Sequence, residues 1–304
     1  MKTKTIHFKI TQKMKILRIL TVTLGLISCS SLLQAQVLYV NYNFNAGSGA
    51  TFANSGTVGG NGTFNTASST TPTYSANAGG VSGLSGDYAL DNTSVASMNG
   101  SGGYGRQSSM NLAASLTSFT LAGWYYAPTA GVANTTLLGQ VSTGVIPQIR
   151  FSSASTLEAV NAGTTVIRGI TTSGASVIQQ TNAWVFFAAT YDGTAALVAD
   201  RLKFYIGDTT TAVTQLTLGT YTATATSSVA NGMWLDIAGR NGLNTFDGLM
   251  DDIAIYGATT GSAGALSSSA LESLRIAAVP EPTTWALLAT ALAVVVTLRR
   301  RRVS

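Results

Sequence analysis

The sequence predicts an all-β fold in which two antiparallel sheets form a sandwich, flanked by an N-terminal signal peptide and a C-terminal transmembrane helix. Roughly 240 residues remain between the two terminal segments, which is enough for one sandwich core. The 32 glycines and a charged fraction of only 10% favour short strands joined by turns. Helix is therefore expected to be the minority element.

Runs of aromatic and β-branched residues recur along the chain, each bounded by Gly, Asn, Asp or Thr. They span residues 119–126, 184–191, 202–206, 215–223, 233–238 and 249–256. Short runs at this spacing indicate an antiparallel sandwich. Residues 58–105 are rich in Gly, Ser and Asn, so we expect loops around one or two weak strands. Residues 269–272 have the spacing of a capping box, which predicts one short helix.

The first 35 residues have the three parts of a secretory signal peptide. The segment is basic up to Arg18, mostly apolar from residue 19 to residue 33, and ends on the small residue Ala35. We therefore expect residues 1–35 to be removed after export by the Sec machinery, which leaves Gln36 as the first residue. Cys29 leaves a second route open, because residues 26–29 resemble a lipoprotein box in which this cysteine is lipidated.

The C-terminal end carries an apolar run followed by a cluster of arginines. Residues 283–298 contain no charged side chain, and Arg299, Arg300, Arg301 and Arg302 follow directly. At ~1.5 Å per residue the run reaches about 24 Å, slightly less than a ~30 Å hydrocarbon core. Arginines at one end of such a run suit the cytoplasmic face of a membrane. We therefore predict a short transmembrane helix, with everything between the two ends exported.

Directly before this helix stand Pro280, Glu281 and Pro282. The motif, the apolar run and the arginine cluster together resemble the PEP-CTERM sorting signal of Gram-negative bacteria, which would cover residues 278–304. The resemblance implies that an exosortase removes the membrane anchor, and that the protein reaches the cell surface or the extracellular matrix, often alongside exopolysaccharide production. Physically, the two prolines keep the backbone extended, a shape that a protease can engage.

The composition of the segment between the two ends excludes several classes of function. Ten of the 17 Lys and Arg residues lie in the terminal segments. The segment between Gln36 and Pro280 therefore contains seven Lys and Arg and 11 Asp and Glu. A mildly acidic body argues against a nucleic-acid partner. The single histidine, His7, and the single cysteine, Cys29, both precede Gln36. The mature domain therefore has no Cys nucleophile, no Ser-His-Asp triad and no His/Cys zinc site.

Six segments of this body resemble successive landmarks of LamG-like (concanavalin A-like) jelly-roll domains, and they occur in the same order. They lie at residues 42–49, 54–56, 119–124, 184–193, 202–207 and 246–256. The resemblance extends over essentially all of residues 36–277. It implies two packed antiparallel sheets, a calcium ion at one edge, and binding of glycans or proteins.

Asp251 and Asn45 are the candidate ligands of one structural Ca²⁺. Asp251 shares strand parity with Ile253 and Ile255, which predicts that it faces the core with them. A buried carboxylate needs a cation or several hydrogen-bond donors. Because Asn45 stands where relatives often carry an acid, the affinity for calcium should be modest. Backbone amides bonded to Asp251 are an equally good explanation of its burial.

Four polar residues in expected loops, Tyr104, Arg106, Asn241 and Asn244, offer planar or amide groups that suit glycan hydroxyls. We take them as candidate ligand-binding residues. The tryptophans at 124, 184 and 234 could stack on sugars, but in strands such side chains more often belong to the core.

No convincing catalytic pair of acids is present. Glu158 and Glu272 stand alone in the sequence, and the adjacent acids Asp251 and Asp252 are expected to point to opposite faces of a strand. The leading hypothesis is therefore an exported surface or matrix protein whose jelly roll is a noncatalytic glycan- or protein-binding module. An atypical glycoside-active enzyme and a purely structural coat protein are the alternatives.

Overall fold

In the computed structural model the described residues run from 36 to 279, with gaps at 69, 94–98, 140–147, 161–166, 172–177, 179 and 224–231. The chain divides into two units, residues 1–35 and residues 36–304, and only the second contains described residues. The predicted signal peptide, the sorting motif and the predicted transmembrane helix therefore lie outside the described residues. Within the described part, no helix is long and apolar enough to cross a membrane.

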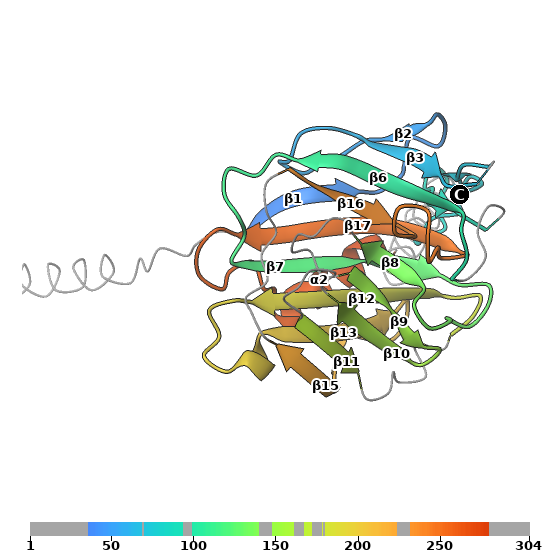
Figure 1. Ribbon diagram of the computed structural model, residues 1–304. Coiled ribbons are helices and arrows are strands. Elements are labelled where there is room, and N and C mark those ends of the chain that lie inside the picture. The colour runs from blue at the N-terminus through green and yellow to red at the C-terminus, as the bar shows by residue number, and fades with distance from the viewer. Residues whose placement is uncertain are drawn as a thin grey trace, which may run out of the picture. The chain divides into compact units, whose positions relative to one another are not determined.

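The domain consists of two antiparallel sheets, as the sequence predicts (Figure 1). Sheet A has eight strands in the spatial order β14-β13-β12-β7-β17-β5-β4, with β1 also paired to β17. Its strands are β1 (Val37–Tyr42), β4 (Thr73–Tyr74), β5 (Leu90–Asp91), β7 (Ser118–Tyr126), β12 (Trp184–Asp192), β13 (Leu202–Asp208), β14 (Thr214–Leu216) and β17 (Leu249–Ala258). Strands far apart in sequence are neighbours, which is typical of a jelly roll.

Sheet B has nine strands in the order β15-β11-β10-β9-β8-β16-β6-β3-β2. Its strands are β2 (Thr51–Phe52), β3 (Gly62–Thr66), β6 (Gly103–Met110), β8 (Thr136–Gly139), β9 (Gln148–Ser153), β10 (Thr156–Val160), β11 (Ile167–Thr171), β15 (Leu218–Ala223) and β16 (Met233–Ile237). The segment from 58 to 105 thus contains β3, β4, β5 and the start of β6, which is more strand than the sequence predicts. A Gly- and Asn-rich segment can still form strands when its neighbours supply the pairing.

The core lies between the sheets because side chains alternate along each strand. On β7, Leu121 and Tyr125 point inward and are fully buried, whereas Ala122 and Trp124 belong to a second cluster on the outer face. The ring of Tyr125 meets that of Phe151, on β9 of the opposite sheet, edge to face at 5.5 Å. Trp124 is only 1% exposed, so its interpretation as a packed side chain rather than a sugar platform is confirmed.

Helix α2 (Ser268–Ala278) covers the outer face of sheet A and accounts for that second cluster. Leu271 of the helix is fully buried there with Trp124 and Phe186. The sequence predicts this helix but places its start two residues too late, because the cap is Ser267, whose Oγ accepts a bond from the amide of Ala270. A short 3-10 helix, η1 (Val198–Asp200), precedes β13.

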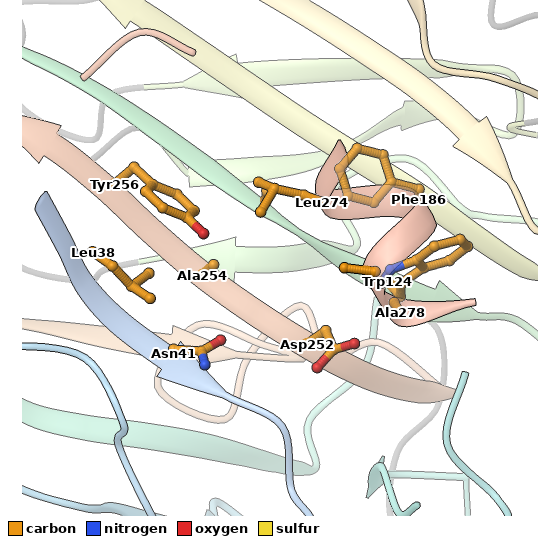
Figure 2. A pocket seen from close by; sticks show the side chains of 11 residues that line it. Leu38, Asn41, Trp124, Phe186, Asp252, Ala254, Tyr256, Leu274 and Ala278 are labelled. Atoms are coloured by element: carbon orange, nitrogen blue, oxygen red, sulfur yellow. The ribbon is translucent and has the colours of Figure 1, made fainter. Parts of the chain in front are cut away.

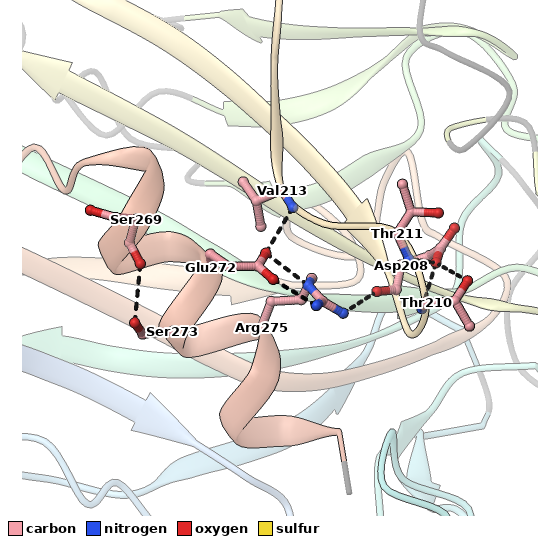
Figure 3. Close-up of polar contacts among 8 residues, drawn as sticks. All are labelled: Asp208, Thr210, Thr211, Val213, Ser269, Glu272, Ser273 and Arg275. Atoms are coloured by element: carbon pink, nitrogen blue, oxygen red, sulfur yellow. Dashed lines mark hydrogen bonds and ion pairs between the residues drawn. The ribbon is translucent and has the colours of Figure 1, made fainter. Parts of the chain in front are cut away.

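The polar side of α2 is fastened to the edge of sheet A (Figure 3). Arg275 binds Glu272 through two N–H···O bonds of 2.9 and 2.7 Å, and its Nη1 donates to the backbone oxygen of Asp208 at 2.7 Å. Glu272 also accepts the amide of Val213 at 2.8 Å. Glu272, which the sequence suggests as part of a capping box, therefore holds the helix to its neighbour instead. The domain is rigidly packed up to the end of α2.

Candidate functional site

The strongest polar cluster lies on the outer face of sheet B. Arg106 on β6 and Asp236 on β16 are cross-strand partners. The guanidinium donates two hydrogen bonds to the carboxylate, from Nε to Oδ1 at 2.6 Å and from Nη2 to Oδ2 at 2.8 Å. Both side chains point away from the core, because their strand neighbours Gln107, Leu235 and Ile237 point inward. A bidentate pair of this kind fixes the orientation of the arginine as well as its position.

Two aromatic rings flank the same guanidinium. Its Cζ lies 5.0 Å from the ring centroid of Tyr104 and 5.1 Å from that of Trp234. Both distances are within the range of a cation–π contact. We call the set formed by Tyr104, Arg106, Trp234 and Asp236 the Arg106 row. Trp234 and Arg106 are the partly exposed members of the row, whereas Tyr104 and Asp236 are buried.

Burial and charge decide the electrostatics of the row. Asp236 is completely buried, and burial raises the pKa of Asp236, an effect that Arg106 offsets only in part. The hydrogen bond to Asp236 in turn raises the pKa of Arg106. Burial also raises the pKa of the Tyr104 hydroxyl. Arg106 therefore stays a cation and Tyr104 stays neutral at any physiological pH.

The structure brings together three of the four predicted ligand-binding residues. Asn241 joins the Arg106 row. Its side-chain Oδ1 accepts a bond from Arg106 at 3.1 Å, and its backbone amide donates to the carboxylate of Asp236 at 2.8 Å. Asn244 does not join it, because its side-chain amide donates to the backbone oxygen of Asn134. The prediction that Tyr104 and Arg106 lie in loops is wrong, because both are in strand β6.

Asp236 and Arg240 at this face are not among the predicted ligand-binding residues, and Trp234 is predicted only as a side chain that could stack on a sugar but more often belongs to the core. Asp236 and Trp234 lie in a strand-like run that the sequence assigns to the core, and Arg240 follows that run. The Nε1 of Trp234 and the Nε of Arg240 are buried and have no hydrogen-bond partner among the described residues. A signal for Asp236 was present: an acid inside an apolar strand needs a cation on a neighbouring strand. Which strand supplies that cation, here β6, depends on the strand pairing of the whole fold and cannot be read from the residues around Asp236.

A second ion pair lies farther along the same sheet. Arg150 on β9 binds Glu158 on β10 through Nε and Oε1 at 2.5 Å. The side chain of Arg150 is 16% exposed, and that of Glu158 only 2%. Glu158, which stands alone in the sequence, is thus paired with an arginine in the fold.

A β-bulge in β17 changes the direction of Asp251. The register with β7 shifts between Asp251 and Ala254, and Asp252 adopts a positive φ of 46°. As a result Met250 and Ile253 both point into the core, and Asp251 is paired with Trp124 on the outer face. The prediction that Asp251 faces inward is therefore wrong, although the side chain is fully buried. A bulge adds one residue to a strand and resets its alternation.

Backbone amides surround the carboxylate of Asp251. Its Oδ2 accepts the amide of Val81 at 3.0 Å, and its Oδ1 accepts the amide of Asp252 at 2.8 Å. Asn45 acts in the same way, since its Oδ1 accepts the amide of Tyr88 at 3.0 Å. Both predicted calcium ligands therefore fasten the segment from residue 81 to residue 88, one at each end.

Three acids influence one another at this edge. Burial, and next the charge of Asp252, raises the pKa of Asp251 well above its ordinary value. Burial and the charge of Asp87 raise the pKa of Asp252 to about 6. The expectation that Asp251 and Asp252 are kept apart on opposite faces fails at the bulge. In the described part of the chain, however, no three acidic, His or Cys side chains are grouped so as to hold a metal ion.

A pocket of about 240 Å³ adjoins Asp252 (Figure 2). Its walls come from β1, β7, β12, β17 and the last turns of α2, and include Trp124, Phe186, Tyr256 and Ala278. Among the described residues that line it, only Asp252 is charged. The pocket lies on the side of sheet A, so it is separate from the Arg106 row.

Two solved structures share the fold. Domain 4 of AbnA, a GH43 extracellular arabinanase from Geobacillus stearothermophilus, in complex with arabinotriose, has a TM-score of 0.52 and 17% identity, and the match covers 79% of this chain and 99% of that chain. The binding domain of botulinum neurotoxin DC in complex with rat synaptotagmin II has a TM-score of 0.51 and 10% identity, over 79% of this chain and 51% of that chain. At these identities the likeness shows the fold alone. The search of curated proteins gave no match.

Two family models match the chain directly. Residues 278–302 match the PEP-CTERM protein-sorting motif, which indicates a secreted, exosortase-processed protein of the cell surface. Residues 99–263, more than half of the chain, match the Laminin_G_3 model. With its two antiparallel sheets in jelly-roll order, the chain belongs to the concanavalin A-like lectin/glucanases superfamily and carries a PEP-CTERM sorting signal.

Proposed function

We propose that this protein is a surface or matrix protein whose jelly roll is a noncatalytic module that binds glycans on the outer face of sheet B. The Arg106 row is the observation that carries the proposal. A guanidinium held between Tyr104 and Trp234 is already ordered before a ligand arrives. Binding then loses little side-chain entropy, which favours affinity.

The chemistry of the row suits a sugar. Exposed aromatic rings pack against the C–H faces of sugar rings, and Trp234 is the partly exposed ring of the row, since Tyr104 is only 6% exposed. Asn241 adds a side-chain amide that suits hydroxyl groups. The arabinanase domain of the same fold was solved with arabinotriose, which gives a precedent for an oligosaccharide on this scaffold. α2 covers the outer face of sheet A, whereas sheet B carries no described helix.

We propose no catalytic role for this face. Hydrolysis of a glycosidic bond normally uses two carboxyl groups placed on either side of the bond. The two acids in the strands of sheet B, Glu158 and Asp236, are each bound to an arginine and almost completely buried. Neither is free to act as an acid or a nucleophile.

For the precursor we propose export through the Sec machinery and anchoring in the inner membrane by residues 283–298, followed by removal of the tail by an exosortase. The match to the sorting motif over residues 278–302 supports this route. The anchor itself lies outside the described residues.

Calcium binding near Asp251 stays a prediction. Both oxygens of Asp251 and the oxygen of Asn45 already accept backbone amides, so this pair does not fit a calcium site as it stands. The described geometry favours the alternative, that Asp251 is a hydrogen-bonded structural acid. No function in the proposal depends on the ion.

A glycan array probed with the exported, processed protein tests the proposal. We expect binding to at least one polysaccharide, and at least about a fivefold loss of affinity in Trp234→Ala, taking the about 1–3 kcal/mol known for nucleic-acid bases stacked on aromatic side chains as the guide. Trp184→Ala removes a half-buried tryptophan from sheet A and should bind normally. A wild-type protein that binds no glycan, or a W234A variant that binds as well as wild type, would contradict the proposal.

A further inference from the structure

We infer that the glycan bound at the Arg106 row is an acidic polysaccharide, and that Arg240 recognises its carboxylate groups. The inference rests on the proposed function, because it names the chemical class of the ligand of the same face. Three observations carry it: the division of charge between the sheets, the exposure of the ion pairs, and the position of Arg240.

Charge is divided unequally between the two sheets. The strands of sheet B contain three arginines and two acids, whereas the strands of sheet A contain one lysine and five aspartates. The acidic excess of the body therefore lies on the side of sheet A. A net acidic protein can still attract an anion locally if the face that meets it carries the opposite charge.

The ion pairs of sheet B expose their cations rather than their acids. The side chain of Arg106 is 19% exposed while that of Asp236 is 0% exposed, and the corresponding values for Arg150 and Glu158 are 16% and 2%. In both pairs the carboxylate lies beneath the guanidinium. A ligand approaching from solvent therefore meets positive charge first.

Arg240 stands beside the Arg106 row in a tight turn. The amide and carbonyl of Arg240 both bond to Leu243 at 2.9 Å, and Asn241 and Gly242 between them have positive φ angles of 51° and 73°, as a two-residue hairpin requires. Asn241 reaches Arg106, and a Cβ placed on Gly239 would lie 3.3 Å from the Cβ of Tyr104. The backbone of Arg240 thus lies between Gly239, which is close to Tyr104, and Asn241, which bonds to Arg106.

The guanidinium of Arg240 lacks an ion-pair partner of the kind that Arg106 and Arg150 have among the described residues. Its Nε is buried without an acceptor, and no described acid forms an ion pair with it. A buried donor left unbonded is unfavourable by about 1–3 kcal/mol. A carboxylate supplies two oxygens in the geometry that a guanidinium fork matches. Because Arg240 as a whole is partly exposed, a uronic acid unit of a polysaccharide would place its carboxylate against the solvent-accessible part of this guanidinium while its ring packs on the row.

The experiment compares the processed wild-type protein with Arg240→Gln. The probes are polygalacturonate, alginate and hyaluronate, each tested intact and after chemical reduction of its carboxyl groups. We expect wild type to bind at least one intact polymer, with affinity that falls as salt rises, and Arg240→Gln to bind it at least tenfold more weakly. The two proteins should bind the reduced polymer equally.

Lys203→Gln is the matched control. Lys203, on β13 of sheet A, is a partly exposed cation that forms no ion pair with another described residue, so its loss changes the net charge equally on the other side of the domain. This variant should bind as wild type does, and melting curves report whether both variants fold. The inference is overturned if Arg240→Gln binds like wild type or if wild type prefers the reduced polymers. If Trp234→Ala loses binding while Arg240→Gln does not, the glycan-binding face stands and only the acidic ligand is wrong.

Discussion

Arg106 neutralises a carboxylate that solvent does not reach, and this decides what its removal does to stability. We predict that Arg106→Ala lowers the free energy of unfolding by about 3–5 kcal/mol, because Asp236 is left charged and unpaired at 0% exposure. Urea denaturation of the two proteins measures the loss.

Arg106→Lys is the control for charge. Lysine keeps the positive charge but cannot form the two parallel bonds or stack flat between Tyr104 and Trp234, so it should recover only part of the loss. A loss below about 1 kcal/mol in Arg106→Ala would mean that the pair behaves as a solvent-screened surface contact.

Calcium dependence is a second property of single residues. If an ion binds near Asp251 in the folded state alone, the protein should gain about 2.7 kcal/mol when calcium is 100 times its Kd. The melting temperature would then rise with millimolar calcium and fall with chelator, and Asp251→Ala would remove the difference. If Asp251 is only a structural acid, the wild-type melt is indifferent to chelator, and Asp251→Ala is destabilised equally in both buffers.

For single residues, the sequence predicts which side chains suit a binding site better than it predicts where they lie in the fold. Tyr104, Arg106 and Asn241 are predicted from residue type and do meet. Asn244 has the same residue type as Asn241, but its side chain serves a neighbouring loop. The partner of Arg106 is 130 residues away, and only the strand register places the two side by side.

Among the elements, α2 makes the most specific prediction. Leu271 is fully buried beneath the helix, whereas Ile276 on the same helix is 38% exposed. We expect Leu271→Ala to lower the free energy of unfolding by about 2–5 kcal/mol and Ile276→Ala by less than about 1 kcal/mol. Urea denaturation again measures both. Similar losses in the two variants would show that α2 does not pack on sheet A as described.

The elements also show where local patterns are sufficient. The aromatic and apolar runs of β7, β12 and β17 are predicted almost to their ends, because strands such as β7 and β12 that are buried on both faces need a nearly continuous apolar sequence. β3, β4 and β5 are mostly missed, since their residues are polar and small and depend on pairing partners. The start of α2 is displaced because two serines compete as caps and only one accepts the amide of Ala270.

For the whole molecule the testable quantity is its mass after export. We predict a mature chain that begins at Gln36 and has lost the segment after residues 280–282, because both ends carry processing signals. Intact-mass measurement of the surface protein, with N-terminal sequencing, reports both cuts. A lipid-modified Cys29 at the start, or a retained Trp285, would contradict the corresponding half of the prediction.

The fold of the whole molecule follows from the sequence more fully than the site does. The two-sheet architecture and the family follow from ordered landmarks, and both are confirmed. The strand order follows only from the assembled fold: β17 lies between β7 and β5, which are more than 120 residues earlier. The Arg106 row, which needs β6 and β16 in register, is therefore the last feature that a sequence reveals.

The bulge in β17 lies at the two adjacent acids Asp251 and Asp252, and it gives this pair a structural role. Two neighbouring acids usually suggest shared chemistry, yet here they mark the point where a strand holds one residue more than its partner. If β17 kept Asp252 but paired with β7 without the bulge, Asp252 would point into the interior in place of Ile253, and every later residue of the strand would exchange faces. Deleting Asp252 would instead remove the extra residue and leave Asp251 and Ile253 on their present faces. The bulge at this pair thus absorbs one surplus residue and keeps the two halves of the last strand in phase with β7.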